Sequence, residues 1–247
     1  MATTRADKPV SGSQTGPRSA RAEQLVPTVT RHAVAITGAT GYMGRALTTK
    51  LLARSHTVRA LIRPGSRGRV VSGSDARELD VFDVDQLARA MEGQDCVVHL
   101  LGIAHPSPAK AREFVSVDLA SARVSIEAAT RVGIKHFIYV SVAQPAPVMK
   151  AYMSTRAEAE RVLIESGLTA TVLRPWYVLG PGHRWPMILL PLYACAELVP
   201  SWRASARRLG LVTLGQMTEA LVRAIEQPPA AGTRRTVEVP EIRRGLG

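Results

Sequence analysis

The sequence predicts an α/β fold, a doubly wound parallel sheet covered by helices on both faces in three layers, α/β/α. Short apolar runs alternate with longer amphipathic stretches from residue 32 onward, and this alternation is typical of a parallel sheet. A glycine-rich turn separates the first apolar run from the first amphipathic stretch. The chain has 247 residues, of which 46% are hydrophobic, and this suffices for one large core.

Strand and helix boundaries follow from hydrophobic periodicity and from the residues that begin or end helices. The expected strands are 33–37, 57–62, 77–81, 96–101, 136–142, 169–174 and 235–239. The expected helices are 41–54, 83–92, 111–132, 152–166 and 215–226. Asp83 with Gln86 and Thr213 with Gln216 are expected to open the second and last helices. Gly133 ends the long third helix.

Residues 1–31 differ from the rest of the chain because they are rich in Ser, Thr, Arg, Gly and Pro and lack an apolar face. Such a segment buries too little surface to fold, so we expect a disordered basic tail, without the apolar segment of a secretory signal. The remainder, 32–247, is interpreted as a single domain. Its small, irregular C-terminal part, about 176–247, is expected on the substrate side.

Composition excludes several classes of protein. The net charge is +12, but no Lys/Arg stripe is interleaved with aromatic residues, which make up only 4%; nucleic-acid binding is therefore not expected. The apolar stretch 187–199 is too short to span a bilayer and contains Glu197, so no membrane span is expected. Cys96 and Cys195 both lie in apolar stretches, which is compatible with a reducing, cytoplasmic location.

The turn "TGATGYMG" carries glycine at every third position. Gly38 permits a tight turn, Gly41 lets backbone amides approach a pyrophosphate, and Gly44 lets the helix pack against the strand. The helix N-terminus then binds the phosphates through its free N–H groups. This strand–turn–helix context predicts a Rossmann-type dinucleotide site. The expected cofactor residues here are Thr37, Gly38, Thr40, Gly41, Tyr42, Met43 and Gly44.

The end of the second strand indicates which dinucleotide binds. An NAD enzyme usually places an acid there, on the adenosine ribose. This chain has Arg63 and then Arg67, with no acid nearby in that loop. A guanidinium suits a 2′-phosphate by charge and fork geometry. NADP(H) is therefore favoured over NAD(H), and the alternative for Arg63 is an ordinary exposed loop residue.

The sequence resembles the short-chain dehydrogenase/reductase superfamily in its extended and atypical branches, the epimerase/dehydratase-like and NmrA-like proteins. The resemblance covers about 33–240 and rests on "TGATGYMG", "ELDVFD", "HLLG", "KHFIYVSV", "AYMSTRAEAE" and "LRPWYVLGPG". It implies that Asp80 and Val81 border the adenine and that Leu101 and Gly102 pass near the cofactor ribose. Pro175, which closes the sixth strand, is also assigned to the cofactor site.

The superfamily's active-site helix carries Tyr-x-x-x-Lys, in which the tyrosine exchanges a proton and the lysine holds the nicotinamide ribose. This chain has Tyr152 and, at the lysine position, Arg156, which share a helix face. The family's Ser or Thr position falls near Ala143, and Ser141 is a substitute. The catalytic candidates are therefore Tyr152, Arg156 and Ser141, and Arg156 is also a cofactor candidate.

Other polar residues are weaker candidates. His105, His183, Arg184 and Trp185 are expected in loops beside the nicotinamide end and are candidates for substrate binding. His99 is interpreted as a packed core histidine. No histidine pair has metal-ligand spacing, so no metal is expected.

The leading hypothesis is an NADP(H)-dependent reductase of the atypical short-chain type that acts on a small carbonyl or enone compound. The alternative is a protein that binds NADP(H) without turnover, as a redox sensor or assembly factor; Arg156 and Ala143 favour it, whereas Tyr152 does not. Sugar-nucleotide epimerisation is a third hypothesis, and it is disfavoured by the short segment after Pro175. The sequence is compatible with a homodimer and with a partner protein, and it does not distinguish between them.

Overall fold

The computed structural model describes residues 1–3, 30–103, 108–145, 149–181 and 209–244. Most of the expected tail lies outside these ranges, as do the four candidate substrate residues, His105, His183, Arg184 and Trp185. Residues 31–247 form one compact unit, and the account below concerns the described parts of that unit.

Seven parallel strands form the main sheet in the order β3-β2-β1-β4-β5-β6-β9, which confirms the doubly wound fold. The strands are β1 Ala33–Thr37, β2 Thr57–Ile62, β3 Asp75–Glu78, β4 Cys96–His99, β5 His136–Val140, β6 Ala170–Arg174 and β9 Arg234–Glu238. The strand order reverses between β1 and β4, which pair directly. Ligands of such sheets bind at the carboxyl ends of the strands, at this switch point.

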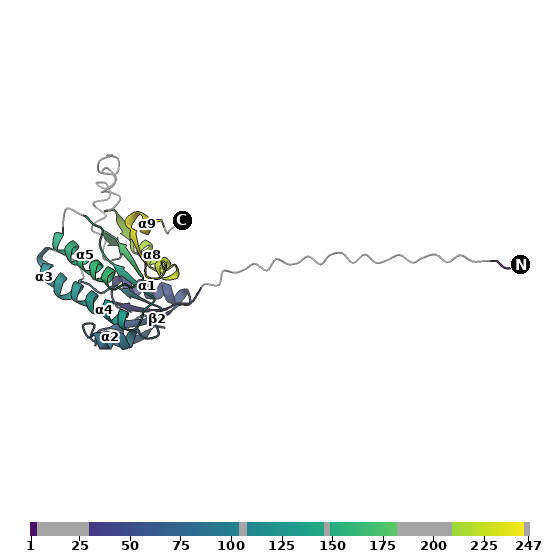
Figure 1. The fold of residues 1–247 in the computed structure, drawn as a ribbon, viewed down its shortest axis with the longest axis horizontal. Coiled ribbons are helices and arrows are strands. Elements are labelled where there is room, and N and C mark those ends of the chain that lie inside the picture. Colours follow the sequence, from purple (N-terminus) through teal and green to yellow (C-terminus); the bar gives the residue numbers. More distant parts are fainter. Residues whose placement is uncertain (4–29, 104–107, 146–148, 182–208, 245–247) are drawn as a thin grey trace, which may run out of the picture. The chain divides into compact units, whose positions relative to one another are not determined.

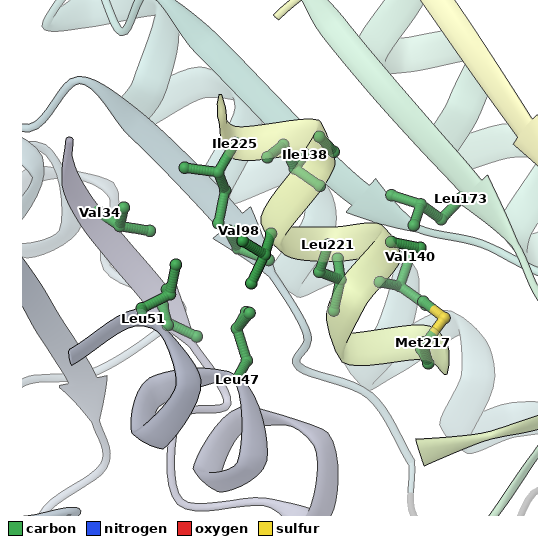
Figure 2. Close-up of a cluster of buried hydrophobic side chains, with 14 of the residues drawn as sticks. Val34, Leu47, Leu51, Val98, Ile138, Val140, Leu173, Met217, Leu221 and Ile225 are labelled. Carbon is green, nitrogen blue, oxygen red and sulfur yellow. The ribbon is translucent and has the colours of Figure 1, made fainter. Parts of the chain in front are cut away.

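Helices cover both faces of the sheet (Figure 1). Packed against one face are α1 (Tyr42–Ala53), α8 (Leu214–Glu226) and α9 (Val239–Arg243), and against the other α2 (Val84–Met91), α4 (Ala120–Arg131) and α5 (Lys150–Glu165). Figure 2 shows Leu47 and Leu51 of α1 and Leu221 of α8 directed at Val34 and Val98 of the sheet. Two buried apolar layers, one on each face, therefore hold the sheet and the carboxyl ends of its strands in place.

Two strand boundaries differ from the prediction, and a second sheet was not predicted. The third strand was expected at 77–81 but is Asp75–Glu78, because β2 ends at Ile62, whose register partner is Glu78. The fourth ends at His99, not at residue 101. A second, two-stranded parallel sheet joins β7 (Tyr177–Leu179) to β8 (Leu211–Thr213); it pairs residues far apart in sequence, which local periodicity does not reveal.

The expected helix 111–132 is interrupted. A 3₁₀ turn (η2, Pro108–Lys110) and a short α-helical turn (α3, Ala111–Glu113) lead into a π-helical segment (η3, Phe114–Leu119), and only then does α4 begin. Phe114 and Asp118 of this segment are fully buried. Segments of this kind often occur at functional sites, and η3 places a carboxylate inside the protein.

Candidate dinucleotide-binding and active site

The glycine-rich turn after β1 leaves no room for side chains at two positions. Gly38 has φ +72°, and a Cβ there would lie 2.9 Å from the backbone carbon of Leu100. A Cβ on Gly44 would lie 2.3 Å from the carbonyl oxygen of Gly38. The amide of Gly41 donates to that same carbonyl at 3.0 Å. The turn thus brings the start of α1 onto the end of β1.

The first turn of α1 suits an anion. Gly41 is its N-cap residue and provides no side-chain hydrogen bond, and no acidic residue occupies the first turn. The leading amides of a helix without such a cap remain available to a ligand. This cradle of backbone amides fits the pyrophosphate of a dinucleotide.

His99 lies beneath this turn, at the end of β4. Its Nδ1 is 3.0 Å from Oγ1 of the buried Thr37, so this threonine side chain is committed to the core. Burial lowers the pKa of His99 to about 3. The interpretation of His99 as a packed core histidine therefore agrees with its environment.

The buried neutral histidines predict loss of stability in acid. The folded-state pKa values are about 3 for His99 and about 4 for His136, below the 6.5 of an unfolded histidine. The free energy of unfolding should therefore fall as pH decreases below 6.5, by roughly 1 kcal/mol per pH unit for each histidine. Urea titrations of wild type, His99→Gln and His136→Gln between pH 7 and 4 test this. A wild-type slope that neither substitution reduces would contradict it.

An acid at the end of β3 lies beside the loop after β2, and the sequence analysis did not anticipate it. Arg63 is exposed, and no described residue forms an ion pair with it. Arg67, however, donates from Nε to Glu78 at 2.9 Å, and the Gly65 amide donates to the same carboxylate at 3.3 Å. The expectation of no acid nearby is wrong, because the register of β3 brings Glu78 beside this loop.

Arg156 is 6% exposed and lies in a buried polar cluster at the ends of β4 and β5. Its Nη2 is 3.0 Å from Oδ2 of Asp118. Its Nη1 donates to the Tyr139 hydroxyl at 3.2 Å and to the Val140 carbonyl at 3.1 Å. A Cβ on Gly102 would lie 2.5 Å from Nη2, so the guanidinium lies against the residue expected to border the ribose.

Tyr152 is half-buried on α5, one turn before Arg156. Its ring meets Phe114 edge to face, with the centroids 5.0 Å apart. The Arg156 Cζ lies 5.1 Å from the Tyr152 ring centroid and 5.7 Å from that of Tyr139. Burial raises the pKa of Tyr139 to about 12. Tyr139 is 1% exposed, so the half-buried Tyr152 is the more accessible tyrosine of this pair.

A family model described as NAD(P)H-binding matches residues 38–183, more than half of the chain. The chain belongs to this NAD(P)H-binding family. The match begins at the glycine-rich turn and includes Arg156 and Asp118.

Relatives of this NAD(P)H-binding protein are reductases and related proteins at low identity. Ceramide reductase of Caulobacter vibrioides is 28% identical over 87% of this chain and 66% of its own length. The mitochondrial NADH-ubiquinone oxidoreductase 40 kDa subunit of Neurospora crassa is 26% identical over 72% of this chain and 46% of its own length. The chain thus spans from about half to two thirds of these relatives.

A solved structure extends the likeness to the fold. A short-chain dehydrogenase/reductase superfamily protein from Agrobacterium tumefaciens with bound NAD superposes with a TM-score of 0.60 at 19% identity, covering 84% of this chain and 77% of the other. The resemblance is therefore confirmed as far as an NAD(P)H-binding family with a Rossmann-type fold. In the described ranges, no helix is long and apolar enough to cross a membrane, and no cluster of metal-binding side chains occurs.

The remaining predicted residues of this NAD(P)H-binding site lie at the carboxyl ends of the strands. Ser141, after β5, is buried, and no hydrogen-bond partner of its Oγ is found in the described structure. Ala143 is buried, and its amide donates to the Pro175 carbonyl. Leu101 and Gly102 follow β4. Thr40, Tyr42 and Met43 lie at the start of α1, and Asp80 and Val81 lie just beyond β3.

Sequence reasoning missed Asp118 and Tyr139 in the NAD(P)H-binding domain. Asp118 is the one acid in the apolar run "FVSVDLA", and an acid among buried positions of a helix is a signal that it needs a partner. Tyr139 lies in a strand that is buried throughout, and nothing in the sequence distinguishes it from an ordinary core residue.

Proposed function

We propose that the chain is an NADP(H)-dependent reductase of a small carbonyl or enone compound. The observation that carries this proposal is the half-buried Tyr152, whose ring lies over the buried Arg156 cation near the carboxyl end of β5 in a domain of the NAD(P)H-binding family. The bound cofactor would supply hydride. Tyr152 would donate the proton that the substrate's oxygen acquires and regain one from solvent, and Ser141 would help to orient that oxygen.

Cofactor binding and substrate reduction are tested separately. Calorimetry first measures the dissociation constant of NADPH. A panel of carbonyl and enone compounds is then screened by the loss of NADPH absorbance, with product analysis to confirm reduction. Binding with turnover supports a reductase; absence of binding contradicts the assignment.

The preference for NADP(H) is a separate proposal that depends on Arg63. An exposed guanidinium without a partner among the described residues is available to a 2′-phosphate, whereas Arg67 is already paired with Glu78. We therefore expect Arg63→Asp to weaken NADPH binding by about ten- to a hundredfold, the worth of a charge-assisted contact, and to leave NADH binding nearly unchanged. Glu78→Gln should strengthen NADPH binding by freeing Arg67.

The control is Asp75→Asn, which removes another exposed carboxylate of β3 that pairs with Arg59 and Arg77. It should leave the ratio of the two dissociation constants unchanged. Equal wild-type affinities for NADPH and NADH would contradict the role of Arg63 and favour NAD(H), with Glu78 as the acid near the ribose.

A non-catalytic role is the second candidate. Arg156 donates to Asp118 and to the Val140 carbonyl, and its Nε is buried without a partner among the described residues, which favours a structural role over contact with a ribose. The Neurospora relative is a subunit of a larger oxidoreductase, which supports an assembly or sensing role with a partner protein. Tight NADPH binding without turnover across the screen would favour this candidate over the reductase. For either candidate we propose a cytoplasmic location, compatible with the free, buried Cys96.

A further inference from the structure

The Asp118–Arg156 pair is the most deeply buried ion pair among the described residues, with side-chain exposures of 0% and 8%. Both carboxylate oxygens accept from N–H donors, Oδ2 from Arg156 and Oδ1 from the Ile103 amide at 2.7 Å. A carboxylate that only accepts hydrogen bonds is the ionised form. Asp118 thus connects the loop after β4 with α5 and cancels the charge of Arg156.

Cancelling this charge affects the proton donor. A lone cation a few ångströms from a phenol favours the phenolate, which is the base that an alcohol oxidation needs. Reduction of a carbonyl needs the protonated phenol. The Arg156 guanidinium lies 5.1 Å from the Tyr152 ring, so its compensation by Asp118 weakens the attraction of this cation for a phenolate.

We propose that Asp118 is a positioning residue for reduction: it holds the Arg156 guanidinium beside the Tyr152 ring and neutralises its charge. This inference rests on the proposed reductase function. Among the described residues, the titratable or charged groups of this cluster are His99 of β4, Asp118 of η3, Tyr139 of β5, and Tyr152 and Arg156 of α5.

The test compares Asp118→Asn with wild type by three measurements. As pH rises, turnover of the variant should begin to fall about one pH unit or more below the pH at which wild-type turnover falls, because the charge of Arg156 is no longer compensated. At alkaline pH its turnover should therefore be about tenfold lower, while NADPH binding is no weaker. Tyr139, followed by NMR of ¹³C-labelled tyrosine and assigned with Tyr139→Phe, should titrate below its wild-type midpoint.

The control is Glu158→Gln, which breaks the exposed ion pair between α5 and Arg123 of α4 and should move neither the pH profile nor Tyr139. A folded Asp118→Asn protein with the wild-type pH profile would show a merely structural role and overturn the proposal. If wild type has no turnover, the proposed function fails, and an unchanged Tyr139 titration in the variant would separately overturn the neutralisation of Arg156.

A second variant covers the case in which Asp118→Asn does not fold. Asp118→Asn with Arg156→Gln removes both charges, so no uncompensated ion remains buried. Its Tyr139 should titrate no lower than the wild-type midpoint, because the cation that would lower that midpoint is gone. A Tyr139 midpoint below that of wild type would overturn the proposal.

Discussion

Tyr152→Phe should lower turnover by about 10²–10⁴-fold, the usual contribution of a positioned acid. The substitution removes one hydroxyl and retains the ring that packs edge to face on Phe114, so the fold should persist. NADPH affinity should barely change, because the phosphates bind at the start of α1. The measurement is steady-state turnover at saturating NADPH, together with calorimetry.

The control for this variant is Ser154→Ala, which removes an exposed hydroxyl two residues away whose described hydrogen bond is to the Ala151 carbonyl. It should turn over at the wild-type rate. Full activity of Tyr152→Phe would refute the assignment of Tyr152 as the proton donor and direct attention to other hydroxyls, Ser141 first.

Arg156→Met should lower the free energy of unfolding by about 3–5 kcal/mol, because removal of one partner of a buried ion pair leaves the other uncompensated. Asp118 would lose the guanidinium and keep only the Ile103 amide. Burial already raises the pKa of the Asp118 carboxyl, and Arg156 offsets part of that rise. Urea unfolding followed by circular dichroism measures the change.

The double variant Asp118→Leu with Arg156→Met should recover most of this loss, because it replaces the pair with apolar side chains. Arg161→Met is the matched control: it removes an arginine of the same helix whose ion pairs with Glu158 and Glu165 are exposed, and such pairs contribute little. A loss as large for Arg161 as for Arg156 would show that helix α5, not the buried pair, is the sensitive element.

The fold could be predicted because its signals are local. The apolar run 33–37 and the glycines that follow it specify a strand, a turn and a helix without reference to the rest of the chain. The helix cap at Thr213 and Gln216 was likewise predictable, and the structure contains both reciprocal hydrogen bonds.

The candidate site was less predictable because its contacts are non-local. The helix position of Arg156 was evident, but its partner lies 38 residues away in a π-helical segment, and hydrophobic periodicity does not distinguish that segment from an α-helix. Glu78 reaches the loop after β2 only through the register of two parallel strands. The cofactor and catalytic assignments therefore stay predictions, for which the structure supplies neighbours and geometry.

The late position of α8 and β9 in the sequence has a consequence for synthesis. The face of the sheet that includes Val34, Val98 and Ile138 is covered partly by α8, and the edge of β6 pairs with β9. A nascent chain that has emerged only as far as β6 therefore carries a partly uncovered apolar face and an open edge, the surfaces through which partly folded chains associate. We expect such a chain to associate more readily than the complete domain until α8 and β9 have emerged.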